Sequence, residues 1–237
     1  MPSGSPFSTT VCSISEHDIG NFSFMVLKAL APEYPFPTQL RQATAAVQHL
    51  LDKGTPPSHI ILAGDSAGGN LVLQLASLIL HPHPTLPLPP TPRLSGADAS
   101  AASESEQPLF GGLLLILPWV EFDTNVPSCV RNAARDIAPT SMYQLFADAV
   151  KPGVSPALHF HFEPGLAPSG WWSGLGRIFP RVLVTGGEHE GLIDPILTTA
   201  AAISEEVQDT TVFVLPGGVH EDLIRRVKVG EGMTISW

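Results

Sequence analysis

The sequence predicts an α/β fold, an open and mostly parallel sheet with helices on both faces. Apolar runs of strand length alternate along the chain with segments of helical periodicity. The strand-like runs are nearly continuous in apolar residues, which is typical of parallel strands buried on both faces. In such a sheet, reactive side chains gather in loops at the carboxyl ends of the strands.

Local signals place the individual elements. Thr38 is the expected N-cap of the first helix, and Asp194-Pro195 is a helix start with proline at the first helical position. A short helix or tail is expected after the last strand. Strands are expected over residues 22–27, 60–63, 111–117, 181–185 and 211–215, and helices over residues 39–51, 70–80, 140–150 and 194–207.

At 237 residues we expect one domain over residues 1–237. Residues 81–108 are rich in proline and then in small and acidic residues, which predicts a disordered surface insertion. His81 and His83 lie within it, and we expect them to be solvated. Residues 119–178 contain no clean strand and follow a central strand, so we interpret them as a lid or cap over the site.

Charge, cysteine content and hydropathy exclude several classes of partner and cofactor. The net charge of −10, without a lysine or arginine cluster, makes nucleic acid an unexpected partner. The two cysteines form no metal pattern and no disulfide framework. No cofactor is predicted, no apolar run reaches membrane-spanning length, and no signal peptide is evident, so we expect a cytoplasmic protein.

One stretch carries the chemistry: the run Gly64-Asp65-Ser66-Ala67-Gly68 joins an apolar strand to an apolar helix. It fits the G-x-S-x-G pattern of a nucleophilic serine on a sharp strand-to-helix turn. Gly64 and Gly68 would remove side chains that collide on so tight a turn. The N–H of Ala67 would then be an oxyanion donor at the helix N-terminus. A phosphate-binding turn is the alternative, but neither of its glycine patterns is present.

A nucleophilic serine needs a base, and the base needs an acid to orient it. His220 follows the last predicted strand, and its place after the acid fits the order serine, acid, histidine. His189 is a rival that we place on the loop surface. The acid lies in the loop after the strand over residues 181–185, where Glu188, Glu190 and Asp194 are all candidates.

The stretches GDSAGGNL at residues 64–71 and LAPEYPFPTQLRQA at residues 30–43 resemble the hormone-sensitive-lipase-like branch of the α/β-hydrolases, in particular its fungal esterases and deacetylases. The resemblance covers roughly residues 24–225. It implies the α/β-hydrolase fold and a catalytic Ser66, Glu190 and His220. It also implies a small apolar or secondary-metabolite ester as substrate, cleaved through an acyl-enzyme.

One departure from the family concerns the oxyanion loop, because residues 1–29 contain no His-Gly-Gly-Gly run. We therefore expect a family member whose N-terminal portion is missing or replaced. The alternative function is a catalytically impaired hydrolase-fold protein or a small-molecule binding module. Trp119, Phe122, Trp171 and Trp172 could line an apolar substrate pocket, with Trp119 and Trp172 preferred, or could pack the cap on the core.

Overall fold

The computed structural model describes residues 31–90 and 109–228, with the side chains of residues 226–228 left out. The strand predicted over residues 22–27 therefore lies outside the described residues. So does the larger part of the insertion predicted over residues 81–108.

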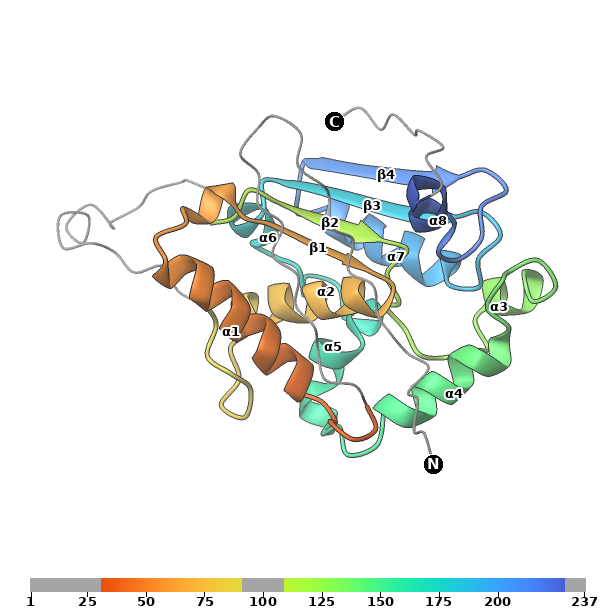
Figure 1. Cartoon of the computed structure of the whole chain (residues 1–237), viewed down its shortest axis with the longest axis horizontal. Helices are drawn as coiled ribbons and strands as arrows, with labels where there is room; N and C mark the ends of the chain where they lie inside the picture. Colours follow the sequence, from red (N-terminus) through yellow and green to blue (C-terminus); the bar gives the residue numbers. More distant parts are fainter. Residues whose placement is uncertain (1–30, 91–108, 229–237) are drawn as a thin grey trace.

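The described chain is built on four parallel strands in the order β1-β2-β3-β4 (Figure 1). The strands pair in register, so that Asp65, Ile116 and Thr185 lie side by side at the carboxyl end. Loops that leave this edge therefore meet one another. The strands are β1 Ile61–Asp65, β2 Gly112–Ile116, β3 Arg181–Gly187 and β4 Asp209–Leu215.

Helices cover both faces of the sheet, as predicted (Figure 1). On one face, α1 (Thr38–Asp52), α2 (Ala67–Leu80) and α7 (Ile193–Ser204) share a large apolar core with the strands. On the other face, Leu223 of α8 (Asp222–Lys228) packs against Leu215 of β4 in a smaller cluster. The predicted α/β class is confirmed.

Burial of the strands is more one-sided than the sequence predicted. Leu113 and Leu115 of β2 are at most 1% exposed, whereas Leu114 between them is only half-buried. Ile61 of β1 is 58% exposed and Val212 of β4 is 41% exposed. Burial on both faces, expected of the strand over residues 111–117, is therefore incomplete at Leu114, and β1 and β4 are the outer strands of the described sheet.

The fully described chain between β2 and β3 contains no strand, as expected. Within it, α5 and the 3₁₀ helix η3 pack on α2 beside the sheet, while α3 and α4 lie apart from that layer (Figure 1). The lid remains a prediction. The elements here are α3 Pro127–Arg131, α4 Thr140–Val150, η2 Pro156–Leu158, α5 His159–Phe162, η3 Pro164–Leu166 and α6 Leu175–Ile178, and a further 3₁₀ helix, η1 Pro57–His59, precedes β1.

Two helix starts differ from the expectation. Thr38 is the first residue of α1 and makes no capping bond, because Pro37 occupies the cap position. Helix α7 begins at Ile193, so Pro195 is its third residue. Proline is tolerated there because the first-turn N–H groups have no partner within a helix.

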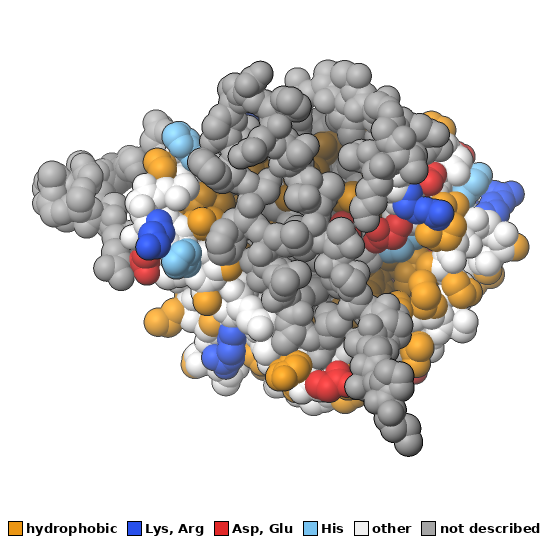
Figure 2. All heavy atoms as spheres, viewed as in Figure 1, with side chains coloured by type: hydrophobic (Ala, Val, Ile, Leu, Met, Phe, Trp, Pro, Cys, Tyr) orange, Lys and Arg blue, Asp and Glu red, His pale blue; other side chains and the backbone are white. Residues whose placement is uncertain are grey.

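Surface side chains on the face drawn in Figure 2 are mixed, with single basic groups beside acidic ones. Apolar side chains gather over α3 and α4, where Val130 is 72% exposed and Leu145 is 63% exposed. Among the described residues, no helix is long and apolar enough to cross a membrane.

Candidate active site

Ser66 stands on the turn between β1 and α2. Its backbone has φ 47° and ψ −115°, a conformation that few L-residues adopt. Backbone bonds outside α2 help to hold it there: Ser66 donates its N–H to Ile116 O at 2.9 Å, and its carbonyl accepts from Trp119 N at 3.0 Å. The strain is thus imposed by neighbours on β2 and the loop after it.

The glycines around Ser66 differ in importance. A Cβ on Gly64 would lie 2.3 Å from the backbone of Gly68, so Gly64 is required for the turn. A Cβ on Gly68 would meet only Asp65 Oδ1 at 3.4 Å, an ordinary contact. The second required glycine is Gly69, where a Cβ would lie 2.7 Å from Pro118 Cβ. The predicted role of Gly68 is therefore corrected in favour of Gly69.

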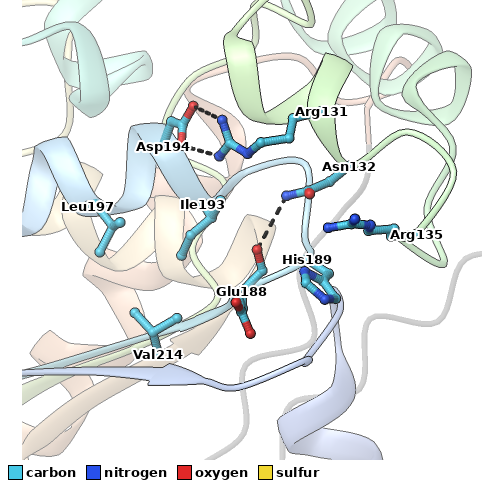
Figure 3. Close-up of a pocket in the computed structure, with 9 residues that line it drawn as sticks. All are labelled: Arg131, Asn132, Arg135, Glu188, His189, Ile193, Asp194, Leu197 and Val214. Atoms are coloured by element: carbon cyan, nitrogen blue, oxygen red, sulfur yellow. Dashed lines mark hydrogen bonds and ion pairs between the residues drawn. The ribbon is translucent and has the colours of Figure 1, made fainter.

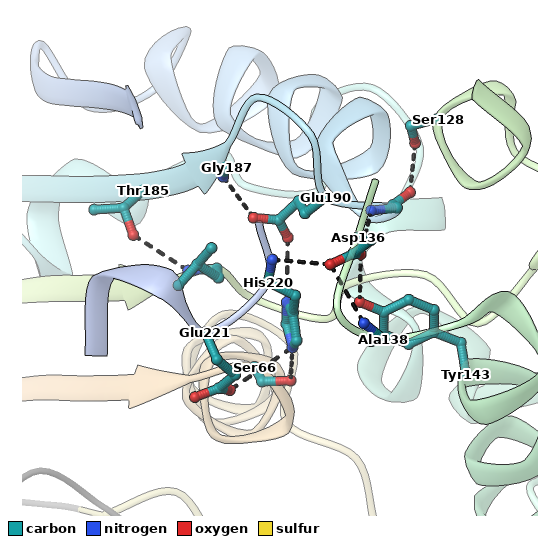
Figure 4. Close-up of polar contacts among 12 residues, drawn as sticks. Ser66, Ser128, Asp136, Ala138, Tyr143, Thr185, Gly187, Glu190, His220 and Glu221 are labelled. Carbon is teal, nitrogen blue, oxygen red and sulfur yellow. Dashed lines mark hydrogen bonds and ion pairs between the residues drawn. The ribbon is translucent and has the colours of Figure 1, made fainter. Parts of the chain in front are cut away.

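The structure brings the three predicted residues together (Figure 4). Ser66 Oγ lies 2.9 Å from His220 Nε2, and His220 Nδ1 lies 3.3 Å from Glu190 Oε1. Glu190 is fully buried, and its other oxygen accepts the N–H of Gly187 at 2.5 Å. Serine, imidazole and carboxylate thus form one chain at the carboxyl edge of the sheet.

His220 is 5% exposed, and the charges around it favour its protonated form. Burial alone would lower the pKa of His220, but the hydrogen bond and charge of Glu190 raise it, with further help from Glu221 and Asp136. The net result is a pKa above the ordinary value of 6.5. An imidazole in these surroundings is well suited to accept a proton from Ser66.

Asp136, which the sequence did not single out as a site residue, joins the two loops of the site. Its Oδ1 accepts from His220 N at 3.0 Å, and its Oδ2 accepts from Gly191 N at 2.7 Å and from the Tyr143 hydroxyl at 3.0 Å. One carboxylate thereby fixes the histidine loop relative to the acid loop (Figure 4).

The segment around α3 also holds the acid loop in place. Ser128 donates its hydroxyl to Gly191 O at 2.5 Å, and Asn132 donates its amide to Glu190 O at 2.9 Å. The side chains of Ser128 and Asn132 are both buried. Burial also raises the pKa of the neighbouring Cys129 thiol to about 11, so this cysteine is a protonated packing group at neutral pH.

The other acid candidates have different partners. Asp194 forms an ion pair with Arg131 at 2.7 Å in the first turn of α7. Glu188 is exposed and accepts the N–H of Gly217 at 2.7 Å, which holds the loop before His220. The rival His189 is half-buried, and its backbone N–H donates to Gly218 O. Of the candidates, Glu190 is the carboxylate that contacts His220 Nδ1.

The four predicted pocket aromatics separate into two places. The backbone N–H of Trp119 donates to the carbonyl of Ser66. However, Trp119 is only 6% exposed, and its ring packs edge-on against Phe122, with 4.6 Å between the ring centroids. Trp171 donates its Nε1 to Ser77 on the last turns of α2, and Trp172 follows it, 3% exposed. At 1.5 Å of rise per residue, that end of α2 lies roughly 15 Å or more from Ser66. The structure therefore does not bring Trp172 to the site.

His81 is likewise not a solvated loop histidine. Its ring lies 3.9 Å from that of Trp171, and its Nε2 is 2.6 Å from Trp171 O. Nearby Leu86 is buried and packs on the domain, whereas Leu88 is 86% exposed. No group of three or more metal-ligating side chains occurs among the described residues.

A surface pocket of about 350 Å³ lies behind the acid loop (Figure 3). Ser66, Glu190 and His220 are not among its lining residues, so it is separate from the triad. It is lined by Arg131, Asn132, Arg135, Glu188, His189, Ile193, Asp194, Leu197 and Val214.

A family model described as the alpha/beta hydrolase fold matches residues 8–223. The chain belongs to this alpha/beta hydrolase family. Similar solved structures include a mutant of the esterase E40, at 27% identity and a TM-score of 0.64 over 86% of this chain and 59% of that one. A hormone-sensitive lipase from a metagenome library matches at 25% identity and a TM-score of 0.63, with 86% and 60% coverage. These likenesses support the hormone-sensitive-lipase-like resemblance.

Curated relatives have related descriptions. The carboxylesterase NlhH of Mycobacterium tuberculosis is 28% identical over 195 residues, which is 78% of this chain and 53% of that protein. The putative acetyl-hydrolase LipR of the same species is 32% identical over 188 residues, with 76% and 51% coverage. The chain thus spans about half the length of the curated relatives it matches.

Proposed function

We propose that this alpha/beta hydrolase cleaves carboxylic esters through a covalent acyl-enzyme. The supporting observation is the continuous chain from Ser66 Oγ to His220 Nε2 and from His220 Nδ1 to Glu190 Oε1. Esterase and acetyl-hydrolase relatives at 28% and 32% identity are consistent with this chemistry.

In the proposed reaction, His220 Nε2 takes the proton of Ser66 as Oγ attacks the ester carbonyl carbon. The imidazolium then gives that proton to the departing alcohol oxygen, which leaves an acyl-serine. Water attacks the acyl carbon, again with His220 as base, and releases the acid and free Ser66. Glu190 holds the imidazole in the tautomer that presents a basic Nε2, and its charge stabilises the imidazolium.

The oxyanion of the tetrahedral intermediate would be bound by the N–H of Ala67. As the first residue of α2, Ala67 has an N–H without a partner inside the helix, and the helix dipole favours negative charge there. The small apolar or secondary-metabolite ester, the fungal type and the contact of Trp119 with substrate also belong to the proposal. Trp119 is retained because its backbone borders Ser66.

The test is hydrolysis of p-nitrophenyl acetate and butyrate by the wild type and by Ser66→Ala. We expect turnover by the wild type with an initial burst of nitrophenol, which is the kinetic sign of an acyl-enzyme. Equal rates for the two proteins would reject the proposal. In that case, tight binding of an ester without turnover would favour the alternative of a small-molecule binding module.

A further inference from the structure

A second carboxylate lies on the Ser66 side of His220. Glu221 Oε1 is 3.7 Å from His220 Nε2, the nitrogen that also faces Ser66 Oγ (Figure 4). Glu190 binds the opposite nitrogen. Glu190 orients the imidazole from beside Nδ1. That role is therefore already filled, and it does not account for the position of Glu221 beside Nε2.

The backbone conformation of Glu221 is strained. Its φ is 66°, in the left-handed region where a side chain is strained and glycine is not. A charged residue in this conformation beside a reactive group is the kind of outlier that points to function. With this backbone, the Glu221 carboxylate lies beside the Nε2 edge of the imidazole.

The mechanism fixes how near the leaving group comes to this carboxylate. To receive a proton, the alcohol oxygen must come within about 3.2 Å of Nε2. Since Nε2 is 3.7 Å from Glu221 Oε1, that oxygen lies no more than about 7 Å from the carboxylate. The nitrogen of an amino alcohol, three bonds beyond that oxygen, can therefore come within range of the Glu221 charge when the substituent turns toward it.

On these grounds we propose that Glu221 is a specificity-determining residue that selects esters of cationic alcohols, such as amino or quaternary ammonium alcohols. The inference rests on the proposed ester hydrolysis. Of the two substrate types proposed there, it favours a secondary-metabolite ester with a cationic alcohol over a small apolar ester. The sign of the local charge agrees with it, because Glu190, Glu221 and Asp136 all surround His220. A leaving group with a carboxylate would be disfavoured by the same field.

The size of the effect follows from Coulomb's law. Two unit charges about 7 Å apart at an effective dielectric constant of about 20 to 40 interact strongly enough to change a rate roughly tenfold. The Glu221 side chain is 33% exposed, so salt should reduce the effect.

The test compares acetylthiocholine with its neutral isostere, in which a tert-butyl group replaces the trimethylammonium group. Released thiol gives kcat/KM for both esters with the wild type, Glu221→Gln and Glu205→Gln. Glutamine keeps the length and the strained backbone position but removes the charge. Glu205, exposed just after α7, is the matched control for a change in net charge.

We expect the cationic-to-neutral ratio of kcat/KM to fall roughly tenfold in Glu221→Gln, and to keep its wild-type value in Glu205→Gln. Raising the salt concentration should lower the wild-type ratio toward that of Glu221→Gln. Turnover of both esters with a ratio that Glu221→Gln leaves unchanged would overturn the inference alone. Turnover of neither ester above the Ser66→Ala rate would overturn the proposed function, and the inference with it.

Discussion

Helix α2 has a serine–histidine pair at each end. At its N-terminus, Ser66 Oγ lies 2.9 Å from His220 Nε2, and near its C-terminus Ser77 Oγ lies 2.9 Å from His161 Nδ1. Both histidines are at most 5% exposed. The hydrogen-bond distance therefore does not distinguish the two pairs, and their surroundings must.

The surroundings differ in charge and access. Carboxylates raise the pKa of His220, whereas burial, with the charges of His81 and His83, lowers the pKa of His161 to about 4. Ser66 is half-buried on a strained turn, while Ser77 is fully buried and also binds Trp171 Nε1. A buried hydroxyl paired with so weak a base is a packing group. The comparison shows that the orienting acid and the strained, half-buried turn separate a candidate nucleophile from a structural serine.

Replacing each serine by alanine should give the largest difference between the two pairs. We expect Ser66→Ala to lower kcat by roughly 10³- to 10⁶-fold, since members of a triad act as a unit. Ser77→Ala should leave ester turnover unchanged but lower the free energy of unfolding by about 1–3 kcal/mol, because it leaves His161 and Trp171 unpaired. Steady-state kinetics and urea unfolding measure the two effects. A large loss of turnover in Ser77→Ala with an intact fold would contradict the distinction.

Removing the charge of Glu190 should make the Ser66–His220 pair more like the Ser77–His161 pair, with a lower histidine pKa. We expect Glu190→Gln to lower kcat by about 10⁴-fold or somewhat less, through loss of the correct tautomer. Because Glu190 raises the pKa of His220, its removal should lower that pKa. The acid limb of kcat/KM should begin above pH 6.5 in the wild type and shift to lower pH in the variant. An acid limb that does not move would show that Glu190 does not set the protonation of His220.

Asp136 tests whether the N-terminal pair depends on its loops being fixed. In Asp136→Asn, one oxygen becomes an NH₂ group that cannot accept from either Gly191 N or Tyr143. We expect a 10- to 100-fold loss in kcat, an order of magnitude comparable to that of removing other hydrogen-bonded supporting groups. Tyr143→Phe removes a single donor to Asp136 and should have a smaller effect. Equal activity of Asp136→Asn and wild type would show that the loops hold their positions without it.

The smallest expected effect concerns the close packing of the first turn of α2 against Pro118. Gly69→Ala would place a methyl group 2.7 Å from Pro118 Cβ and should lower the free energy of unfolding by about 1–3 kcal/mol. Gly68→Ala, one residue earlier, meets only Asp65 Oδ1 at 3.4 Å and is the matched control. Thermal unfolding of both variants measures the difference. Equal melting temperatures would contradict the assigned roles.

The sequence predicted the four described strands, α4, and the residues Ser66, His220 and Glu190, because their signals are local. Glycines, apolar runs and the order of polar residues after strands can all be recognised without the fold. The geometry of Ser66, His220 and Glu190 agrees with that expectation.

Other features depend on contacts that sequence patterns do not reveal. Asp136 is separated by 55 and 84 residues from Gly191 and His220, whose N–H groups it accepts. The position of Trp172 in the predicted cap predicts a contact with substrate, but the chain there returns to the far end of α2. Thr38 has a typical capping side chain, yet Pro37 occupies the cap position.

The central claim is that Ser66, and not another buried serine, is the activated nucleophile. Labelling with a fluorophosphonate, followed by intact mass and peptide mapping, tests it most directly, with Ser66→Ala and His220→Ala as controls. We predict one label per chain on Ser66, none in Ser66→Ala and much slower labelling in His220→Ala. Labelling that persists in Ser66→Ala, or proceeds at the same rate without His220, would contradict the account.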